Sequence, residues 1–468
     1  MLLEKDIQCL FFEFVSSQAG IDQNDENVGS GNCGAELARV ARMGVSVPVK
    51  QLSQDDTVSS LREAFRGVED DLMSCEDWEV RVVEGVLGMN RLCSGTLYGM
   101  MYGECGSGCG APSDYLGARA SIQIEYSRVE ELVCRRLDLR RGQGEQNYFK
   151  LLSRLSGARD CILPGGFRPV LGEIVQRHRA LQFLASDQVF RELYIETVIS
   201  RIFYELDVLE LRRLRLKDFR GTRLVGILLG MRGDESFDDL TDYFDYQHFY
   251  VLYSRFVELD VDEDQSLALD EFKRHDFGAI TESALARIWD CNIRGKRGLF
   301  RDEVDPARKM SYHDFIYFYI SDEDKTTERS IRYWFEIIDF DCDGWIGLQE
   351  IDHFYREQRA RCRELSYAVP ELDNISCMVN DLLMPGIQGR FRLDDFLRNK
   401  LVAGHFFNIL VNTKKCLSSM FMDGELNSLQ AVILQRSGFK APSPWDLHCQ
   451  YQYQIIQDSR QDEASVQK

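Results

Sequence analysis

The chain has 468 residues, of which 44% are hydrophobic and 28% are charged, enough material for roughly two to four globular units. Its formal net charge of −20 disfavours binding to nucleic acids or anionic lipid surfaces, because like charges repel. The same charge suits divalent cations and basic protein partners.

The N-terminal stretch MLLEKDIQCLFFEF contains Glu4, Lys5, Asp6 and Glu13, so it lacks the uncharged core of a signal peptide. No segment reaches the roughly 18 uncharged apolar residues that are needed to cross a bilayer. The 14 cysteines are scattered without a CxxC pair, which is typical of reduced thiols. We therefore expect an intracellular, cytoplasmic protein without membrane insertion, and leave open an association with the cytoskeleton or the nucleus.

The spacing of apolar residues divides the chain into regions. Residues 1–140 include a Gly-rich run and have no fold that we can assign. Over residues 145–423 apolar residues recur mostly at three- and four-residue spacing, which predicts amphipathic helices. The units we predict are helices with degenerate loops (145–235), two regions with one calcium loop and one degenerate unit each (240–325 and 328–423), and a C-terminal tail with a disordered end (424–468).

A weak repeat runs through this helical region. In each unit a helix ending in aromatic residues is followed by a short loop, one apolar residue and a second helix. The apolar residue recurs at Leu214, Leu267, Met310, Ile346 and Phe391, at irregular intervals of roughly forty residues. The predicted fold class is therefore all-α, an elongated helical body of helix–loop–helix units in series.

The first acidic loop reads DVDEDQSLALDE from Asp260 to Glu271. Calcium takes about 6–8 oxygen ligands, and a 12-residue EF-hand loop supplies them from positions 1, 3, 5, 7, 9 and 12. The ligands predicted here are Asp260, Asp262, Asp264, Ser266 through its backbone carbonyl, and Glu271. Position 6 is Gln265, where a left-handed backbone costs a non-glycine residue ~1–2 kcal/mol. An acidic turn without metal remains the alternative for this loop.

The second acidic loop reads DFDCDGWIGLQE from Asp339 to Glu350. The ligands predicted here are Asp339, Asp341, Asp343, Trp345 through its backbone carbonyl, and Glu350. Gly344 at position 6 permits the sharp turn, and Gly347 at position 9 leaves room for a water. The sequence therefore predicts two calcium ions per chain.

The remaining units have lost their ligands. Around Leu214, the would-be positions 3 and 5 are Leu209 and Leu211, and around Phe391 they are Gly386 and Gln388. Around Met310 the spacing is broken by the stretch EVDPARKM. Such units keep the helix pair without the ion, which is a structural role.

Two other chemistries fit less well. The string DFDCD resembles the nucleophile motif of aspartate phosphotransferases, but the apolar residues before it keep helical spacing. The run GSGCGA at 106–111 resembles a dinucleotide-binding fingerprint, yet no apolar strand leads into it. None of the seven histidines has the spacing of a known metal or catalytic motif, and we expect them to be surface or core residues.

Five aromatic-rich stretches carry a family resemblance. They are ETVISRIFY (196–204), LTDYFDYQHFYVLYSRFVELDVD (240–262), MSYHDFIYFYISDEDK (310–325), SIRYWFEIIDFDCDGWI (330–346) and LQEIDHFYREQ (348–358). The chain resembles the B-double-prime family of protein phosphatase 2A regulatory subunits over roughly residues 145–423, and the likeness fades towards both ends.

The resemblance implies a rod of EF-hand units that binds a HEAT-repeat scaffold subunit and the catalytic subunit of the phosphatase. This chain would then direct the hydrolysis of phosphoserine and phosphothreonine without catalysing it, and it would have no catalytic residue of its own. The alternative is a calcium sensor or cytoskeletal adaptor for an unrelated target. An enzyme within residues 1–140 is a third hypothesis, but no nucleophile–base pair is evident there.

Overall fold

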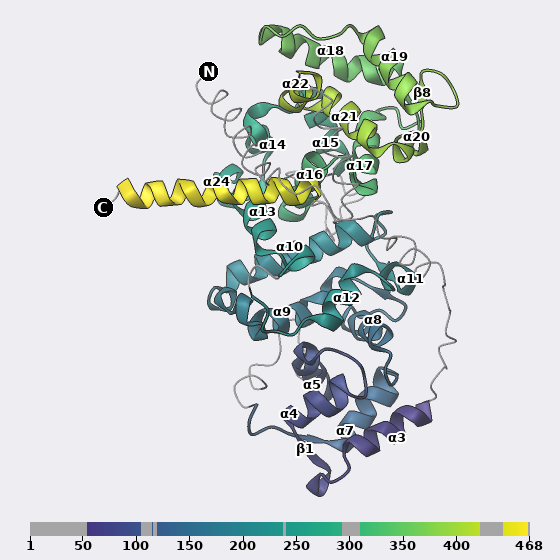
Figure 1. Ribbon diagram of the computed structural model, residues 1–468, viewed down its shortest axis with the longest axis vertical. Coiled ribbons are helices and arrows are strands. Elements are labelled where there is room, and N and C mark those ends of the chain that lie inside the picture. Colours follow the sequence, from purple (N-terminus) through teal and green to yellow (C-terminus); the bar gives the residue numbers. More distant parts are fainter. Residues whose placement is uncertain are drawn as a thin grey trace, which may run out of the picture. The chain divides into compact units, whose positions relative to one another are not determined.

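The computed structural model describes residues 54–103, 115, 119–236, 240–292, 309–421 and 443–466. All of these residues belong to the unit that spans 52–468. Helices dominate them, and the described strands form four short antiparallel pairs (Figure 1). The all-α prediction is therefore confirmed. No described helix combines the length and the apolar character required to span a bilayer.

The first pair of helix–loop–helix units lies in the region to which the sequence assigns no fold. In its first unit α3 (Gln54–Ala64) leads through η1 (Glu69–Asp71) and β1 (Leu72–Ser74) into α4 (Cys75–Asp77) and η2 (Trp78–Glu84). In the second, η3 (Arg91–Cys93) and α5 (Ser94–Tyr102) precede β2 (Gln123–Glu125), α7 (Tyr126–Glu130) and η4 (Glu131–Arg136). Met73 of β1 lies opposite Ile124 of β2. The helical repeat therefore begins well before residue 145.

The second pair contains the first of the predicted degenerate loops. Its first unit consists of α8 (Gly144–Leu155), β3 (Cys161–Ile162), η5 (Pro164–Phe167) and α9 (Arg168–Arg177), and η6 (Arg179–Ser186) leads to the next. Its second unit consists of α10 (Gln188–Leu206), β4 (Leu214–Arg215), α11 (Leu216–Phe219) and α12 (Arg223–Gly230). Ile162 lies opposite Leu214, so the predicted apolar residue has a partner that the sequence did not reveal.

The third and fourth pairs each contain one acidic loop. The third consists of η8 (Asp242–Phe244), α13 (Tyr246–Leu259), β5 (Ser266–Leu267), α14 (Leu269–Phe272), η9 (His275–Gly278), α15 (Glu282–Asn292), β6 (Met310–Ser311) and α16 (Tyr312–Glu323). The fourth consists of α17 (Glu328–Ile338), β7 (Ile346–Gly347), α18 (Leu348–Glu364), α19 (Leu372–Leu383), β8 (Arg390–Phe391) and α20 (Leu393–Arg398), followed by α21 (Lys400–Val411) and α22 (Thr413–Phe421). Leu267 lies opposite Met310, and Ile346 lies opposite Phe391.

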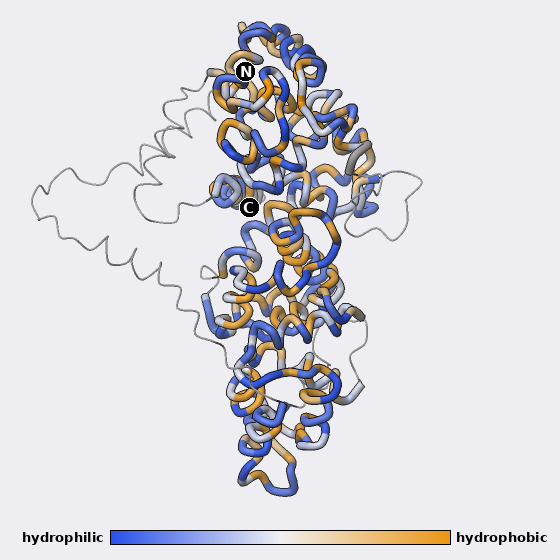
Figure 2. Tube along the Cα trace, turned by 90° about the vertical axis from the view of Figure 1, so that its right-hand side faces the viewer, coloured by the Kyte–Doolittle hydropathy of each residue, from blue (hydrophilic) through white to orange (hydrophobic). Residues whose placement is uncertain are grey.

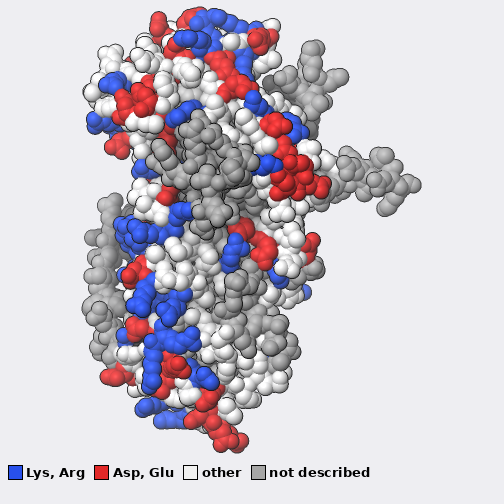
Figure 3. Space-filling model, turned by 180° about the vertical axis from the view of Figure 1, so that it is seen from behind, with Lys and Arg blue, Asp and Glu red and all other residues white. Residues whose placement is uncertain are grey.

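One apolar core runs through all four pairs. The paired strand residues are its most sheltered members, because Met73, Ile124, Ile162, Leu214, Leu267, Met310, Ile346 and Phe391 are all 0% exposed. Apolar and polar stretches succeed one another along the helical trace (Figure 2), as expected of amphipathic helices, in which apolar residues recur every three to four positions. On the face opposite to that of Figure 1, lysine and arginine side chains gather over the first two pairs, although the chain is acidic overall (Figure 3).

The C-terminal segment forms a helix, α24 (Pro444–Val466). The helix α24 extends over residues 459–466, for which the sequence predicts a disordered end. The helix packs against α13 and α16. Its Trp445 ring makes edge contacts with His248 of α13 and Tyr319 of α16, and Trp445 is only 6% exposed. Burial of this aromatic residue stabilises the packing of α24 against α13 and α16.

Candidate metal sites

The first acidic loop joins α13 to α14 and gathers its aspartates at one point. Carboxylate oxygens of Asp260, Asp262 and Asp264 all lie within 4.8 Å of one another. The Asp260 carboxylate accepts hydrogen bonds from the amides of Asp264 at 3.2 Å and Gln265 at 3.0 Å. These bonds fold the loop back over its first residue and bring the three side chains together.

The other two predicted ligands of this loop close it from the far side. The Ser266 amide and hydroxyl donate to Asp264 at 2.9 and 2.7 Å. Glu271 is 5% exposed, and its two carboxylate oxygens accept from the amides of Val261 and Ala268, both at 2.9 Å. The glutamate thus connects the start of the loop to the start of the exiting helix.

The second acidic loop, between α17 and α18, has the same construction. Asp339, Asp341 and Asp343 place carboxylate oxygens within 4.8 Å of one another. Asp339 accepts from the amides of Asp343 at 3.2 Å and Gly344 at 3.0 Å. The Trp345 amide donates to Asp343 at 2.8 Å, in the place that Ser266 holds in the first loop.

Glu350 lies in the first turn of α18 and is 5% exposed. It accepts from the amide of Gly347 at 3.0 Å, just as Glu271 accepts from Ala268. Each loop therefore offers four carboxylates and a backbone carbonyl, and this all-oxygen set fits a hard cation such as calcium.

The backbone conformation at position 6 agrees with the strain expected at Gln265 in the first loop. Gln265 has φ +66°, in the left-handed region, and Gly344 has φ +83°. Glu263 and Cys342 at position 4 are also left-handed, with φ +57° and +61°. The two loops therefore share one backbone path, and only the first forces a non-glycine residue into its tightest turn.

Basic residues from the paired units, which sequence reasoning missed, lie at both loops. The Lys309 ammonium donates to Asp262 at 3.3 Å and to Asp264. The hydrogen bond from Lys309 holds the pKa of Asp264 below its ordinary value. The Arg390 guanidinium donates to Asp343 at 2.9 Å. Both basic residues directly precede a repeated apolar residue, which is the signal that could have revealed them.

The loop around Leu214 has the same backbone without the ligands. Asp207 accepts from the amides of Leu211 at 2.9 Å and Arg212 at 2.7 Å, and Arg212 has φ +57°. Leu209 and Leu211, 61% and 41% exposed, stand where the second and third aspartates would be. The loop has the EF-hand backbone geometry, but it lacks side-chain oxygen atoms at positions 3 and 5.

Two of the sequence interpretations concern residues that the structure does not describe. Most of the EVDPARKM stretch before Met310 lies outside the described residues, and so does the glycine run at 106–111. The unit around Phe391 is described, and its Gly386 and Gln388 offer no side-chain carboxylate. The metal-free character of that unit stays a prediction.

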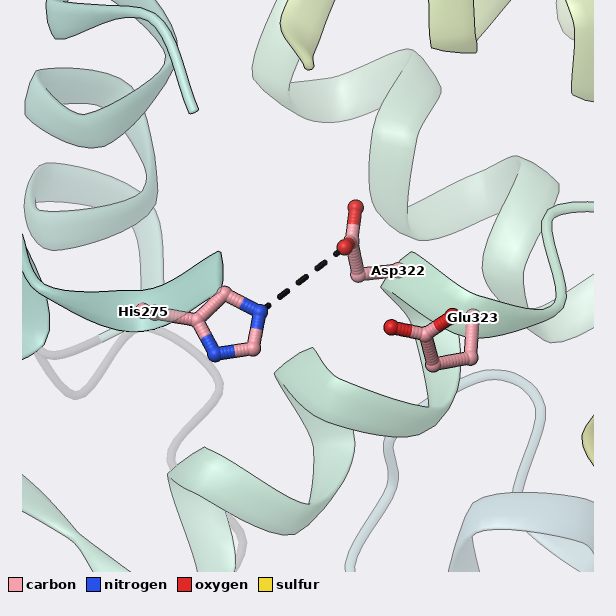
Figure 4. A group of neighbouring side chains, drawn as sticks. All are labelled: His275, Asp322 and Glu323. Carbon is pink, nitrogen blue, oxygen red and sulfur yellow. Dashed lines mark ion pairs between the residues drawn. The ribbon is translucent and has the colours of Figure 1, made fainter. Parts of the chain in front are cut away.

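A third group of possible ligands, His275, Asp322 and Glu323, lies in the core (Figure 4). Asp322 is already bound by Lys325 at 2.5 Å and by Lys415 at 2.7 Å, and Lys415 also lies 3.2 Å from Glu323. The two ammonium groups neutralise the charge of the two carboxylates and would repel a metal cation. The His275 ring nitrogen is 3.9 Å from Asp322, too far for a hydrogen bond. We assign this cluster to an internal ion network rather than to a metal site.

Comparisons with known proteins bear on the fold and the family of the chain. A family model of the EF-hand domain matches residues 145–234, the second pair of units. The human B'' beta regulatory subunit of serine/threonine-protein phosphatase 2A is 32% identical over 298 residues, 62% of this chain and 49% of that protein. The probable B''delta regulatory subunit of Arabidopsis thaliana is 34% identical over 257 residues, 55% of this chain and 47% of that protein.

A solved structure of a PP2A PR70 holoenzyme contains a chain that is 31% identical, with a TM-score of 0.52. The match covers 58% of this chain and 98% of that one. Against the full sequences of the two curated relatives above, the chain spans about half their length.

Proposed function

The chain belongs to the B'' family of protein phosphatase 2A regulatory subunits, and we propose that it is a calcium-binding regulatory subunit of such a phosphatase. The observation that supports this most strongly is the match, at 31% identity, to nearly all of a chain from a PP2A holoenzyme structure. In this proposal the chain binds the scaffold and catalytic subunits and selects the substrate or location. The partner supplies the hydrolytic chemistry, and this chain is not itself an enzyme.

We propose that each acidic loop holds one calcium ion. The first would use Asp260, Asp262, Asp264, Glu271 and the carbonyl of Ser266, and the second would use Asp339, Asp341, Asp343, Glu350 and the carbonyl of Trp345. The convergence of three aspartates in each loop supports this assignment. Bound calcium would neutralise charges that otherwise repel within each loop, and so stiffen the connection between the entering and exiting helices.

The same proposal places the protein inside the cell. The nine cysteines whose side chains are described are all free thiols, as a reducing compartment allows. We propose the cytoplasm as the site of action, where calcium changes could reach the loops.

The test is co-elution of the full chain with a purified core of scaffold and catalytic subunits, in calcium and in chelator. We expect a stable ternary complex in calcium. The double variant Glu271→Gln with Glu350→Gln is the matched control, because its elution should be the same in both buffers. Failure of the wild-type chain to co-elute in calcium would refute the phosphatase role and favour a calcium sensor or adaptor with another target.

A further inference from the structure

Each acidic loop is contacted by a basic residue from the metal-free unit with which it is paired. In the third pair, Lys309 reaches Asp262 at 3.3 Å and also Asp264. In the fourth pair, Arg390 reaches Asp343 at 2.9 Å. In both loops the contacted group includes the aspartate at position 5, which is one of the proposed calcium ligands.

Strand pairing fixes the position of both basic residues. Lys309 directly precedes Met310, which lies opposite Leu267 of the first loop. Arg390 directly precedes Phe391, which lies opposite Ile346 of the second loop. The two basic residues are therefore equivalent, and the metal-free partner unit holds each one beside a ligand.

The loop around Leu214 is also contacted by a basic residue, which here comes from outside its own strand pair. Arg329, from α17, pairs with Glu210 at 2.5 Å and donates to the carbonyl of Val208 at 3.3 Å. Its side chain is 5% exposed, whereas that of Lys309 is 24% exposed and that of Arg390 is 51% exposed. A cation buried in this way cannot leave without losing its partners, but a more exposed cation such as Lys309 or Arg390 can move into water.

We propose that Lys309 and Arg390 are tethered competitors of calcium, through which each metal-free unit lowers the calcium affinity of the loop beside it. An arriving ion must displace the basic group or tolerate a positive charge nearby, and either course weakens binding. Lys309 contacts two ligands and is more sheltered than Arg390, so it lowers affinity more. The pairing of a calcium-binding unit with a metal-free unit then sets the calcium concentration to which each site responds.

This inference rests on the proposed function, since it requires that the loops bind calcium. The test uses the full chain with one loop disabled at a time, titrated with calcium in a calorimeter. With Glu350→Gln in place, Lys309→Met should tighten the Asp260 loop by roughly 3- to 10-fold. With Glu271→Gln in place, Arg390→Met should tighten the Asp339 loop by roughly 2- to 5-fold.

Two variants serve as matched controls. Arg392 has the same charge and lies 4.0 Å from the Trp345 ring, closer than Arg390 at 5.3 Å. Among the described hydrogen bonds and ion pairs, however, it has none with an aspartate of the loop. Arg392→Met should therefore change the affinity much less than Arg390→Met. Lys309→Arg keeps the charge and should restore nearly the wild-type affinity.

The outcomes distinguish the competitor role of Lys309 and Arg390 from the assignment of calcium to the loops. If calcium binds but Lys309→Met and Arg390→Met leave both affinities unchanged or weaken them, the competitor role is wrong and the metal assignment stands. If the wild-type chain takes up no calcium, the metal assignment itself is overturned, and this inference with it.

Discussion

At the scale of single residues, the two acidic loops differ at position 6 as well as in the basic residue that contacts them. Both present three aspartates and one glutamate, so charge alone does not rank them. Gln265 occupies the left-handed region at φ +66°, which costs a non-glycine residue ~1–2 kcal/mol. Gly344 adopts φ +83° without that cost.

We therefore predict that the Asp339 loop binds calcium more tightly than the Asp260 loop, by roughly 5- to 30-fold. Calcium titration of Glu271→Gln and Glu350→Gln separately measures each loop. Gln265→Gly tests whether backbone strain is the cause. It should tighten calcium binding by the Asp260 loop while leaving Lys309 in place. Equal affinities for the two single variants would show that the strain is offset elsewhere in the loop.

The internal ion network gives a second prediction at this scale. Asp322 is 1% exposed; burial alone would raise its pKa, but Lys325 and Lys415 outweigh burial and hold it well below the ordinary value. Lys415→Met should lower the free energy of unfolding by about 3 kcal/mol, because it leaves a buried carboxylate with one partner fewer. The neighbouring Lys414, 60% exposed and paired with Asp276, is the control, and Lys414→Met should cost less than about 1 kcal/mol.

Urea denaturation at pH 7 measures both variants. A depressed carboxylate pKa stabilises the fold above the unfolded pKa of about 4, and this contribution is lost as the pH falls below that value. The difference between Lys415→Met and the wild type should therefore shrink in acid. A cost for Lys415→Met no larger than that of Lys414→Met would mean that Lys325 alone satisfies Asp322.

At the scale of elements, the sequence predicts the repeat through its apolar residues. Leu214, Leu267, Met310, Ile346 and Phe391 stand out in the sequence by position alone, and each is a fully buried strand residue. The strand pairs also contain Ile162, Met73 and Ile124, which the sequence pattern does not reveal. Their loops contain few carboxylates at ligand positions, so nothing in the sequence marks them as members of the same repeat.

The site was predictable to the extent that it is local in sequence. All ten predicted ligands lie within two 12-residue windows, where spacing alone defines the geometry. Lys309 lies 45 residues from Asp264 and Arg390 lies 47 residues from Asp343, so the strand pairing is needed to show that they contact the loops. The C-terminal helix α24 was missed for the same reason, because burial of Trp445 depends on surfaces of α13 and α16.

Removal of the anchor of α24 should destabilise the fold. Trp445 is 6% exposed, and Trp445→Ala should lower the free energy of unfolding by about 3–5 kcal/mol. Leu447 lies on the same helix but is 46% exposed, so Leu447→Ala should cost less than about 1 kcal/mol. Urea midpoints compare the two variants, and equal midpoints would mean that α24 does not pack as described.

At the scale of the whole molecule, the four pairs use one construction for different purposes. Two of them combine an acidic loop with a unit that is predicted to be metal-free, and the pair that contains Leu214 has the loop geometry without carboxylates at positions 3 and 5. The family model of the EF-hand domain matches this second pair, residues 145–234, and neither acidic loop lies in that range. Agreement with the family model there reflects helices and strand pairing, which a unit keeps after it has lost the ion.

A prediction of stoichiometry follows from this difference: the full chain should bind two calcium ions. Native mass spectrometry and calorimetry should give two ions for the wild type, one each for Glu271→Gln and Glu350→Gln, and none for the double variant. Three ions would mean that the loop at Asp207 binds as well. That result is disfavoured because Leu209 and Leu211 supply no side-chain oxygen and Arg329 lies against the loop.

The Asp207 loop also allows two reasons for its expected lack of calcium binding to be distinguished, namely the missing carboxylates and the nearby Arg329. Leu209→Asp with Leu211→Asp restores the missing carboxylates, and both side chains are exposed enough to accept the change. If the carboxylates alone were lacking, this double variant would bind a third ion. We expect no third ion, because Arg329 remains in place with 5% of its side chain exposed, and its charge opposes a dication. A third ion appearing while Arg329 is intact would show that a buried cation beside an EF-hand loop does not by itself exclude calcium.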